Sequence, residues 1–173
     1  MTDDAALIDG YKAGDHGSFE ALMLKYRIPA LHFALRYVRD VYIAEDIVQD
    51  SFADLYVYRN RYRKDYSFKT YLFAILKNKS IDFLRKRKPE CLYESTFFEE
   101  MFEQDFLERE NCNWVRKNLN RLKADYRTVI YLKEYEGFSY QEIGEIMEKN
   151  QGQVKILIFR AKRKLKDLLE AEA

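Results

Sequence analysis

Residues 139–166 read SYQEIGEIMEKNQGQVKILIFRAKRKLK, and this stretch predicts two short helices joined by a tight turn. Ser139 and Glu142 have the S-x-x-E spacing of a capping box, which marks the start of the first helix. Asn150 and Gln153 form a weaker reciprocal pair, which marks the start of the second. The pattern is typical of a helix-turn-helix, a motif that binds DNA.

The second helix of this motif is strongly basic. From Lys149 to Lys166 the sequence has seven Lys or Arg residues and no Asp or Glu. A helix with this charge attracts phosphate. A merely solvated face is the alternative, and the complete lack of acids counts against it. Gly144 lies where a side chain would hold the two helices apart, so its small size has a packing reason.

Two large apolar residues, Ile156 and Phe159, fall on the outer face of this helix. The opposite stripe is expected to be buried and consists of Val154, Ile158, Ala161 and Leu165. An exposed apolar side chain forgoes the free energy of burial. We therefore expect the outer face to be shared between DNA and a surface that covers it, either another protein or the first part of this chain.

Composition predicts an all-α protein. The chain has 173 residues, 47% of them hydrophobic, with six Gly and two Pro, too few for a turn-rich β fold. Cys91 and Cys112 lack metal-binding spacing, so neither a zinc site nor a disulfide framework is predicted, and a reducing cytoplasm fits best. No apolar run is long enough to span a membrane, and the acidic N-terminus is unlike a signal peptide.

Charge divides the chain into three parts. Residues 1–88 carry 16 basic and 12 acidic side chains, residues 89–110 carry one and eight, and residues 111–173 carry 13 and nine. Apolar periodicity fails between Pro89 and Glu110. We therefore predict two small helical domains, 1–88 and 112–173, joined by an acidic linker, 89–111. Carboxylates in such a linker can imitate phosphates.

Apolar spacing and capping residues predict four helices in the first domain. The first is a short helix near 3–13 that ends at Gly14 and Gly17, and the second is a long helix capped by Ser18 with a kink or break at Pro29. The third is capped by Asp40 and runs to about Arg59. The fourth starts at Ser67 and ends near Lys88.

The Asp40 helix has a polar face made by Asp46, Gln49, Asp50 and Asp54. An ordinary solvated face is one interpretation. A metal-dependent hydrolase is another, but the only histidines, His16 and His32, are out of register with these carboxylates, so we expect no catalysis and no metal or other cofactor.

Cations and aromatic rings alternate around the loop before the last helix of this domain. Single-stranded nucleic acid is bound by cations along its backbone and by flat side chains that stack on its bases. The residues that provide this mixture are Arg59, Arg61, Tyr62, Arg63, Lys64, Tyr66, Lys69 and Tyr71. Such aromatics are more often core residues, but the polar context favours function for Tyr62 and Tyr66. Along the helix, Asn78, Asp82 and Arg85 form either a packing network or a DNA contact.

Three segments in this order resemble the bacterial extracytoplasmic-function (ECF) class of RNA polymerase sigma factors. They are AEDIVQDSF at 44–52, FKTYLFAILKNKSIDFLR at 68–85, and YEGFSYQEI at 135–143 running into Val154, Lys155, Arg160 and Ala161. The resemblance implies a sigma-two domain, a sigma-four domain and a linker that threads core RNA polymerase. It also implies promoter DNA and an anti-sigma factor as partners, with no membrane insertion of its own.

The resemblance also implies site residues. Those for docking on a clamp coiled coil of the largest polymerase subunit are Asp46, Gln49, Asp50 and Ala53. Those for the −10 strand are Arg61, Tyr62, Lys64, Tyr66, Lys69, Tyr71, Asn78, Lys79 and Arg85. Those for the −35 duplex are Tyr140, Gln151, Gln153, Lys155, Ile156, Arg160 and Arg163. The alternative function is a one-component helix-turn-helix regulator that binds an operator without polymerase.

Overall fold

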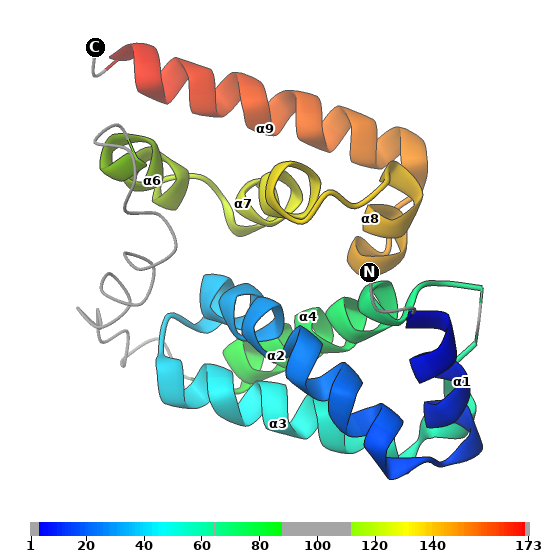
Figure 1. The fold of residues 1–173 in the computed structure, drawn as a ribbon. Coiled ribbons are helices and arrows are strands. Elements are labelled where there is room, and N and C mark those ends of the chain that lie inside the picture. Colours follow the sequence, from blue (N-terminus) through cyan, green and yellow to red (C-terminus); the bar gives the residue numbers. More distant parts are fainter. Residues whose placement is uncertain (1–3, 64, 88–111, 172–173) are drawn as a thin grey trace. The chain divides into compact units, whose positions relative to one another are not determined.

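The computed structural model describes residues 4–63, 65–87 and 112–171, which are helical and contain no strand (Figure 1). These ranges form two compact units, one before and one after the predicted linker. The linker itself, 89–111, lies outside the described residues, as does Lys64. The all-α prediction is confirmed.

The first unit consists of α1 (Asp4–Ala13), α2 (His16–Val38), α3 (Val41–Val57), the short 3-10 turn η1 (Arg59–Arg61) and α4 (Phe68–Lys86). Helix α2 packs against α1, α3 and α4, and α3 packs against α4 (Figure 1). Large side chains that are almost fully buried fill the space between them, among them Tyr11, Leu22, Phe33, Leu55, Phe68 and Phe73.

Short polar residues start three of these helices. Asp40 accepts hydrogen bonds from the backbone N–H groups of Tyr42 and Ile43, and Ser67 accepts one from Thr70, so both predicted caps are confirmed. The predicted Ser18 cap is wrong. Helix α2 begins at His16 because Asp15 is the residue whose side chain accepts, 2.7 Å from the Ser18 N–H.

Helix α2 does not end at Pro29. The proline removes one backbone hydrogen bond, yet the helix continues to Val38. Ala30 to Leu35 are all buried, so tertiary packing of this stretch holds it in the helical conformation. The predicted break is therefore wrong, since burial outweighs local propensity, whereas the kink at Pro29 stays a prediction.

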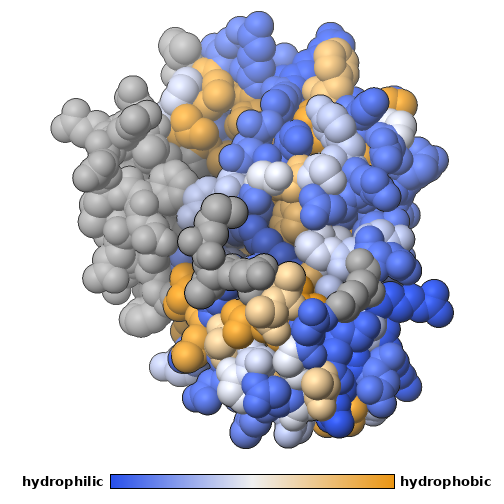
Figure 2. Space-filling view, turned by 45° about the vertical axis from the view of Figure 1, so that its right-hand side comes forward, coloured by the Kyte–Doolittle hydropathy of each residue, from blue (hydrophilic) through white to orange (hydrophobic). Residues whose placement is uncertain are grey.

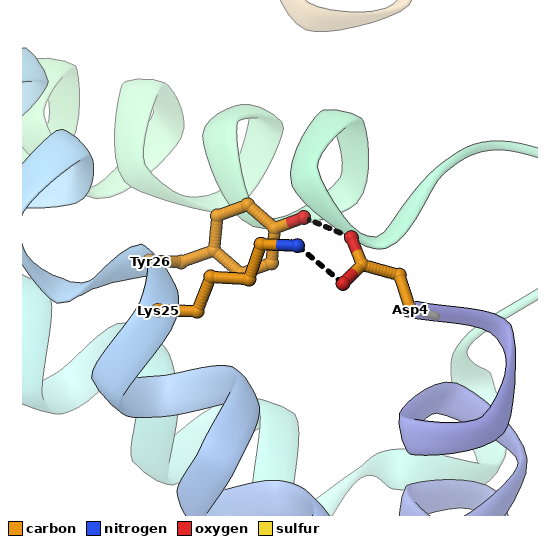
Figure 3. A network of polar contacts seen from close by, with 3 residues as sticks. All are labelled: Asp4, Lys25 and Tyr26. Atoms are coloured by element: carbon orange, nitrogen blue, oxygen red, sulfur yellow. Dashed lines mark hydrogen bonds and ion pairs between the residues drawn. The ribbon is translucent and has the colours of Figure 1, made fainter. Parts of the chain in front are cut away.

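Helix α1 is fastened to α2 by a polar network at its first residue (Figure 3). The Asp4 carboxylate accepts a hydrogen bond from the Tyr26 hydroxyl at 2.6 Å and pairs with the Lys25 ammonium. The Tyr26 ring lies 5.6 Å from that of Phe68, so the network continues into the packing of α4. The first residue described is thus anchored to the core.

The second unit consists of α6 (Cys112–Asn120), α7 (Ala124–Ile130), the π-helical turn η2 (Tyr131–Tyr135), α8 (Tyr140–Met147) and α9 (Gln151–Ala171). Helix α9 packs against α6, α7 and α8 (Figure 1). The fully buried side chains include Val129, Leu132, Ile143, Ile146, Val154 and Ala161. The helix predicted from Asp125 to Gly137 is present, but its second half widens into η2.

The helix-turn-helix is built as predicted. Ser139 and Glu142 exchange both hydrogen bonds of a capping box. The Asn150 N–H donates to Gln153 Oε1 at 3.0 Å, and the Gln153 N–H donates to Asn150 Oδ1 at 2.8 Å. A Cβ built on Gly144 would lie 2.5 Å from the carbonyl oxygen of Lys149, so glycine lets the turn fold back against α8.

Hydrophilic residues make up most of the face seen in the space-filling view, and hydrophobic residues form small groups among them (Figure 2). None of the helices in the described ranges combines the length and hydrophobicity that a membrane span needs.

Candidate protein and nucleic-acid interfaces

The outer face of α3 carries the four residues proposed for docking. Asp46, Gln49, Asp50 and Ala53 are all exposed, while the opposite face of the helix is buried. On that inner face the Ser51 hydroxyl donates to the Ile47 carbonyl oxygen at 2.6 Å. The helix therefore presents a polar surface from a rigid support, and the structure brings all four residues together.

Asp54, on the next turn of this face, has a different role. Its carboxylate pairs with the Lys79 ammonium of α4 at 2.7 Å. This ion pair connects α3 to α4. It also engages the Lys79 side chain, which the resemblance assigns to DNA binding. Strand binding by Lys79 would therefore require it to leave or share Asp54.

The segment between α3 and α4 presents several basic and aromatic side chains. Arg61, Arg63 and Tyr66 are exposed. The Arg61 guanidinium lies over the Tyr58 ring, 4.3 Å from its centroid. Stacking of this kind keeps a guanidinium plane extended and still charged, which suits contact with a DNA backbone.

Tyr62 does not belong to this exposed set. Only 4% of the residue is exposed, its ring packs beside Tyr11, Phe68 and Tyr71, and its hydroxyl donates to the Tyr66 carbonyl oxygen at 2.9 Å. A ring with both faces covered cannot stack on a base. The prediction that Tyr62 is a base platform is therefore wrong, and the core interpretation holds.

Helix α4 exposes Asn78, Asp82 and Arg85, so the buried packing network considered for them is not found. Arg85 and Asp82 form only an exposed ion pair of 3.8 Å, a type that stabilises little. Tyr71 is half-buried, with its ring 5.4 Å from that of Tyr62, and Lys69 is half-buried with its ammonium 5.7 Å from the Phe73 ring centroid.

The second unit clusters two lysines around the Tyr140 ring at the start of α8. The Lys133 ammonium is 4.6 Å from the ring centroid, and the Lys155 ammonium is 5.6 Å from it. Sequence reasoning included Tyr140 and Lys155 but missed Lys133, which precedes the motif and reaches it only because η2 packs beside α8. The cluster places two cations beside the capped helix start.

The remaining residues proposed for duplex binding lie exposed on α9. They are Gln151, Gln153, Lys155, Ile156, Arg160 and Arg163. Ile156 is 53% and Phe159 66% exposed, opposite the buried Val154, Ile158 and Ala161. The described part of their own unit therefore leaves them uncovered. Within the described ranges no cluster of His, Cys, Asp or Glu could hold a metal ion, so the hydrolase alternative has no site there.

Family models match both units. The model for sigma-70 region 2 matches residues 22–90, and that for sigma-70 region 4 matches residues 112–165. The chain is 31% identical to the RNA polymerase sigma-H factor of Pseudomonas aeruginosa, over 96% of this chain and 94% of that one. It is 30% identical to the ECF sigma factor SigW of Bacillus subtilis, over 91% and 92%.

Solved structures share the fold. The sigma factor RpoE of Bartonella quintana, in complex with the anti-sigma factor NepR, matches with a TM-score of 0.68 at 24% identity, over 90% of this chain and 98% of that one. CnrH, in complex with the cytosolic domain of CnrY, matches with a TM-score of 0.74 at 24% identity, over 98% and 99%. With two sigma-70 regions in order and relatives aligned over almost the whole length, the chain belongs to the ECF family of RNA polymerase sigma factors.

Proposed function

We propose that this chain directs core RNA polymerase to specific promoters and assists promoter opening. The observation that carries the proposal is the doubly capped helix-turn-helix with basic α9, joined in one chain to a region 2 unit. In this account residues 1–88 dock on polymerase and hold the −10 strand, residues 89–111 link the domains, and residues 112–173 read the −35 element.

Docking is assigned to Asp46, Gln49, Asp50 and Ala53, against the clamp coiled coil of the largest polymerase subunit. The support is that all four are exposed on one helix face while the helix is anchored by its buried side. Carboxylates at the edge of a protein interface steer a basic partner and fix its register. The exposed position also means that their replacement leaves the core of the unit intact.

Binding of the −10 strand is assigned to residues of the segment before α4 and of α4 itself. They are Arg61, Tyr66, Lys69, Tyr71, Asn78, Lys79 and Arg85, with Lys64 kept as a sequence-based candidate outside the described residues. Their support is a mixture of cations and rings on adjoining surface, the chemistry that binds single strands. Tyr62 is left out because it is buried.

Reading of the −35 duplex is assigned to Tyr140, Gln151, Gln153, Lys155, Ile156, Arg160 and Arg163. Arginine and glutamine can form paired hydrogen bonds with base edges in the major groove, and an apolar side chain such as Ile156 can contact a thymine methyl group. Gln153 already uses Oε1 as a cap acceptor. We therefore assign it to fixing the start of α9 at the groove as well as to DNA contact.

The partners follow from this role. We propose that the chain works in the cytoplasm, where core polymerase and promoter DNA are found, and that it catalyses no reaction of its own. The related folds of RpoE and CnrH were solved with NepR and with the cytosolic domain of CnrY. By likeness to them, we propose that an anti-sigma factor restrains this chain.

Co-purification followed by run-off transcription tests the proposal. The chain, mixed with core polymerase of the bacterium that encodes it, is expected to co-purify with core and to yield discrete transcripts from a library of genomic fragments. Core alone provides the background. A chain that binds discrete DNA sites alone, fails to bind core and yields no transcript would instead be a one-component regulator.

A further inference from the structure

Tyr11 joins α1 to α3, to α4 and to the segment between them, which is the proposed strand-binding segment. The residue is 1% exposed, and its hydroxyl donates to the Leu55 carbonyl oxygen of α3 at 2.5 Å. Its ring lies 5.6 Å from Phe68, at the start of α4, in an edge-on arrangement, and 6.2 Å from Tyr62. A single α1 side chain therefore touches α3, the segment and α4.

Tyr62 fastens the segment itself. Its ring lies 6.1 Å from Phe68 and 5.4 Å from Tyr71, with the Lys12 ammonium of α1 5.8 Å from its centroid. Its hydroxyl reaches forward to the Tyr66 carbonyl oxygen. The Tyr62 side chain thus connects Tyr66 to the aromatic cluster.

The end of α1 also lies against the first turn of the segment. Gly14 adopts φ +88, and a Cβ built on it would lie 3.4 Å from the Arg59 guanidinium nitrogen Nη2. Helix α1 contacts η1, which carries Arg59 and Arg61. The same helix therefore supports both η1 and the buried tyrosine that follows it.

We propose that Tyr11 and Tyr62 are positioning residues for promoter opening: they hold residues 58–63 and 65–67 in the arrangement that presents Arg61, Arg63 and Tyr66 to the melted strand, without contacting DNA themselves. The inference rests on the proposed sigma-factor function. It assigns to α1, which begins before the region 2 match at residue 22, an indirect part in strand binding through the segment that it supports.

A segment that is already ordered in the free protein binds DNA at a lower cost in entropy, an effect called pre-organisation. An exposed loop that must be ordered when DNA binds loses backbone and side-chain entropy at that moment, whereas a loop already held by its own core does not. Burial raises the pKa of Tyr11 to about 12 and also raises the pKa of Tyr62. A tyrosine hydroxyl is already protonated at neutral pH, and burial disfavours its ionisation further, so both hydroxyls act as hydrogen-bond donors.

Two conservative variants separate positioning from direct contact. Tyr62→Phe keeps the ring and removes the hydrogen bond to the Tyr66 carbonyl, while Tyr11→Phe removes the bond to the Leu55 carbonyl. Tyr42→Phe is the matched control, because Tyr42 is 78% exposed on α3. Circular dichroism and thermal melting check that each variant is folded at the assay temperature.

The probe is a fluorescein-labelled duplex of a promoter that the wild-type protein transcribes, with a mismatched bubble at the −10 element. Anisotropy gives the affinity of the reconstituted holoenzyme for this bubble, and a separate titration gives the affinity of each variant for core. Both Phe variants are expected to lose about 2- to 10-fold in bubble affinity, the equivalent of one hydrogen bond. Core affinity and the Tyr42→Phe control are expected to be unchanged.

Two results would overturn the inference. Full bubble affinity in both Phe variants would show that the two hydroxyl groups do not position the strand-binding segment. Equal losses in bubble and core affinity would indicate general destabilisation. Full affinity in Tyr62→Phe but a large loss in a folded Tyr62→Leu would show that the packed ring, and not the hydroxyl, positions the segment. Failure of the wild-type chain to transcribe any fragment is a different result, which removes the proposed function itself.

Discussion

At the scale of single residues, the environment of a side chain decides its role more than its position in the sequence does. Asp4 lies at the N-terminal end of α1, yet it receives hydrogen bonds from Lys25 and Tyr26 (Figure 3). Burial alone would raise the pKa of Asp4, but these hydrogen bonds and the charge of Lys25 outweigh it and lower the pKa below 3.8. The network therefore stabilises the folded state only while Asp4 is ionised.

Replacing Asp4 tests this network. A carboxyl whose folded pKa is lowered contributes stability above its unfolded pKa, and the contribution is lost as the pH falls through the folded pKa. Asp4→Asn is expected to cost about 1 kcal/mol at neutral pH, and urea unfolding should show this cost shrinking below about pH 4. Glu20→Gln, at an exposed position on α2, is the control. A cost that does not change with pH would contradict the account.

Gly144 offers a test in which packing and helix propensity oppose each other. In the middle of a helix, alanine is more favourable than glycine by about 0.5–1 kcal/mol. A Cβ at Gly144 would nevertheless meet the Lys149 carbonyl at 2.5 Å. Gly144→Ala is therefore expected to destabilise the second unit by about 1–3 kcal/mol, whereas Gly17→Ala, with only an ordinary contact at 3.7 Å, should not destabilise its unit. Thermal melting of both variants would measure the difference.

At the scale of helices, the predictions that succeeded rest on local chemistry. The Asp40, Ser67 and Ser139 caps and the Asn150–Gln153 pair each involve residues within three positions of one another, so the sequence alone identifies them. The helix-turn-helix and the exposed α3 face follow from the same short-range patterns.

The predictions that failed depend on contacts between distant parts of the chain. Tyr62 is buried because Tyr11, on a helix far back in the sequence, covers it. Helix α2 passes through Pro29 because other helices pack on the residues that follow. The Lys79–Asp54 pair likewise joins two helices and could not be deduced from either. The sequence of a single helix does not reveal such contacts between distant parts of the chain.

The α3 face supports a prediction about docking. Asp50→Lys reverses one exposed charge without touching the buried side of the helix. Because charges at an interface steer association and repel a like-charged partner, affinity for core polymerase is expected to fall roughly tenfold or more, with unchanged helicity. Glu20→Lys, the same change on α2, is the control. Equal affinity of the Asp50 and Glu20 variants for core would remove α3 from the docking surface.

At the scale of the whole molecule, charge is separated along the chain. Residues 89–110 carry eight acidic side chains and one basic, and they lie in sequence between two parts that each have an excess of basic residues. The net charge of +1 is therefore the sum of two basic parts, which we expect to attract phosphate, and one acidic segment, which we expect to compete with it. The free protein is expected to bind DNA weakly for this reason.

Replacing residues 90–110 with a neutral linker of equal length tests the competition. Nonspecific DNA affinity of the free chain is expected to rise and its salt dependence to steepen, because more protein cations then displace counterions from the DNA. Titration of a fluorescent duplex at several salt concentrations gives both quantities. If neither changes, the acidic segment does not compete with DNA.

The central claim, that this chain opens promoters only as a subunit of polymerase, is tested most directly by permanganate reactivity of thymines at the −10 element. A promoter fragment chosen by run-off transcription is treated with the chain alone, with core alone and with both. The account predicts reactive thymines only when both are present, and loss of that reactivity with the Asp50→Lys variant at limiting protein. Site-specific binding by the chain alone, with no thymine reactivity when core is added, would contradict it.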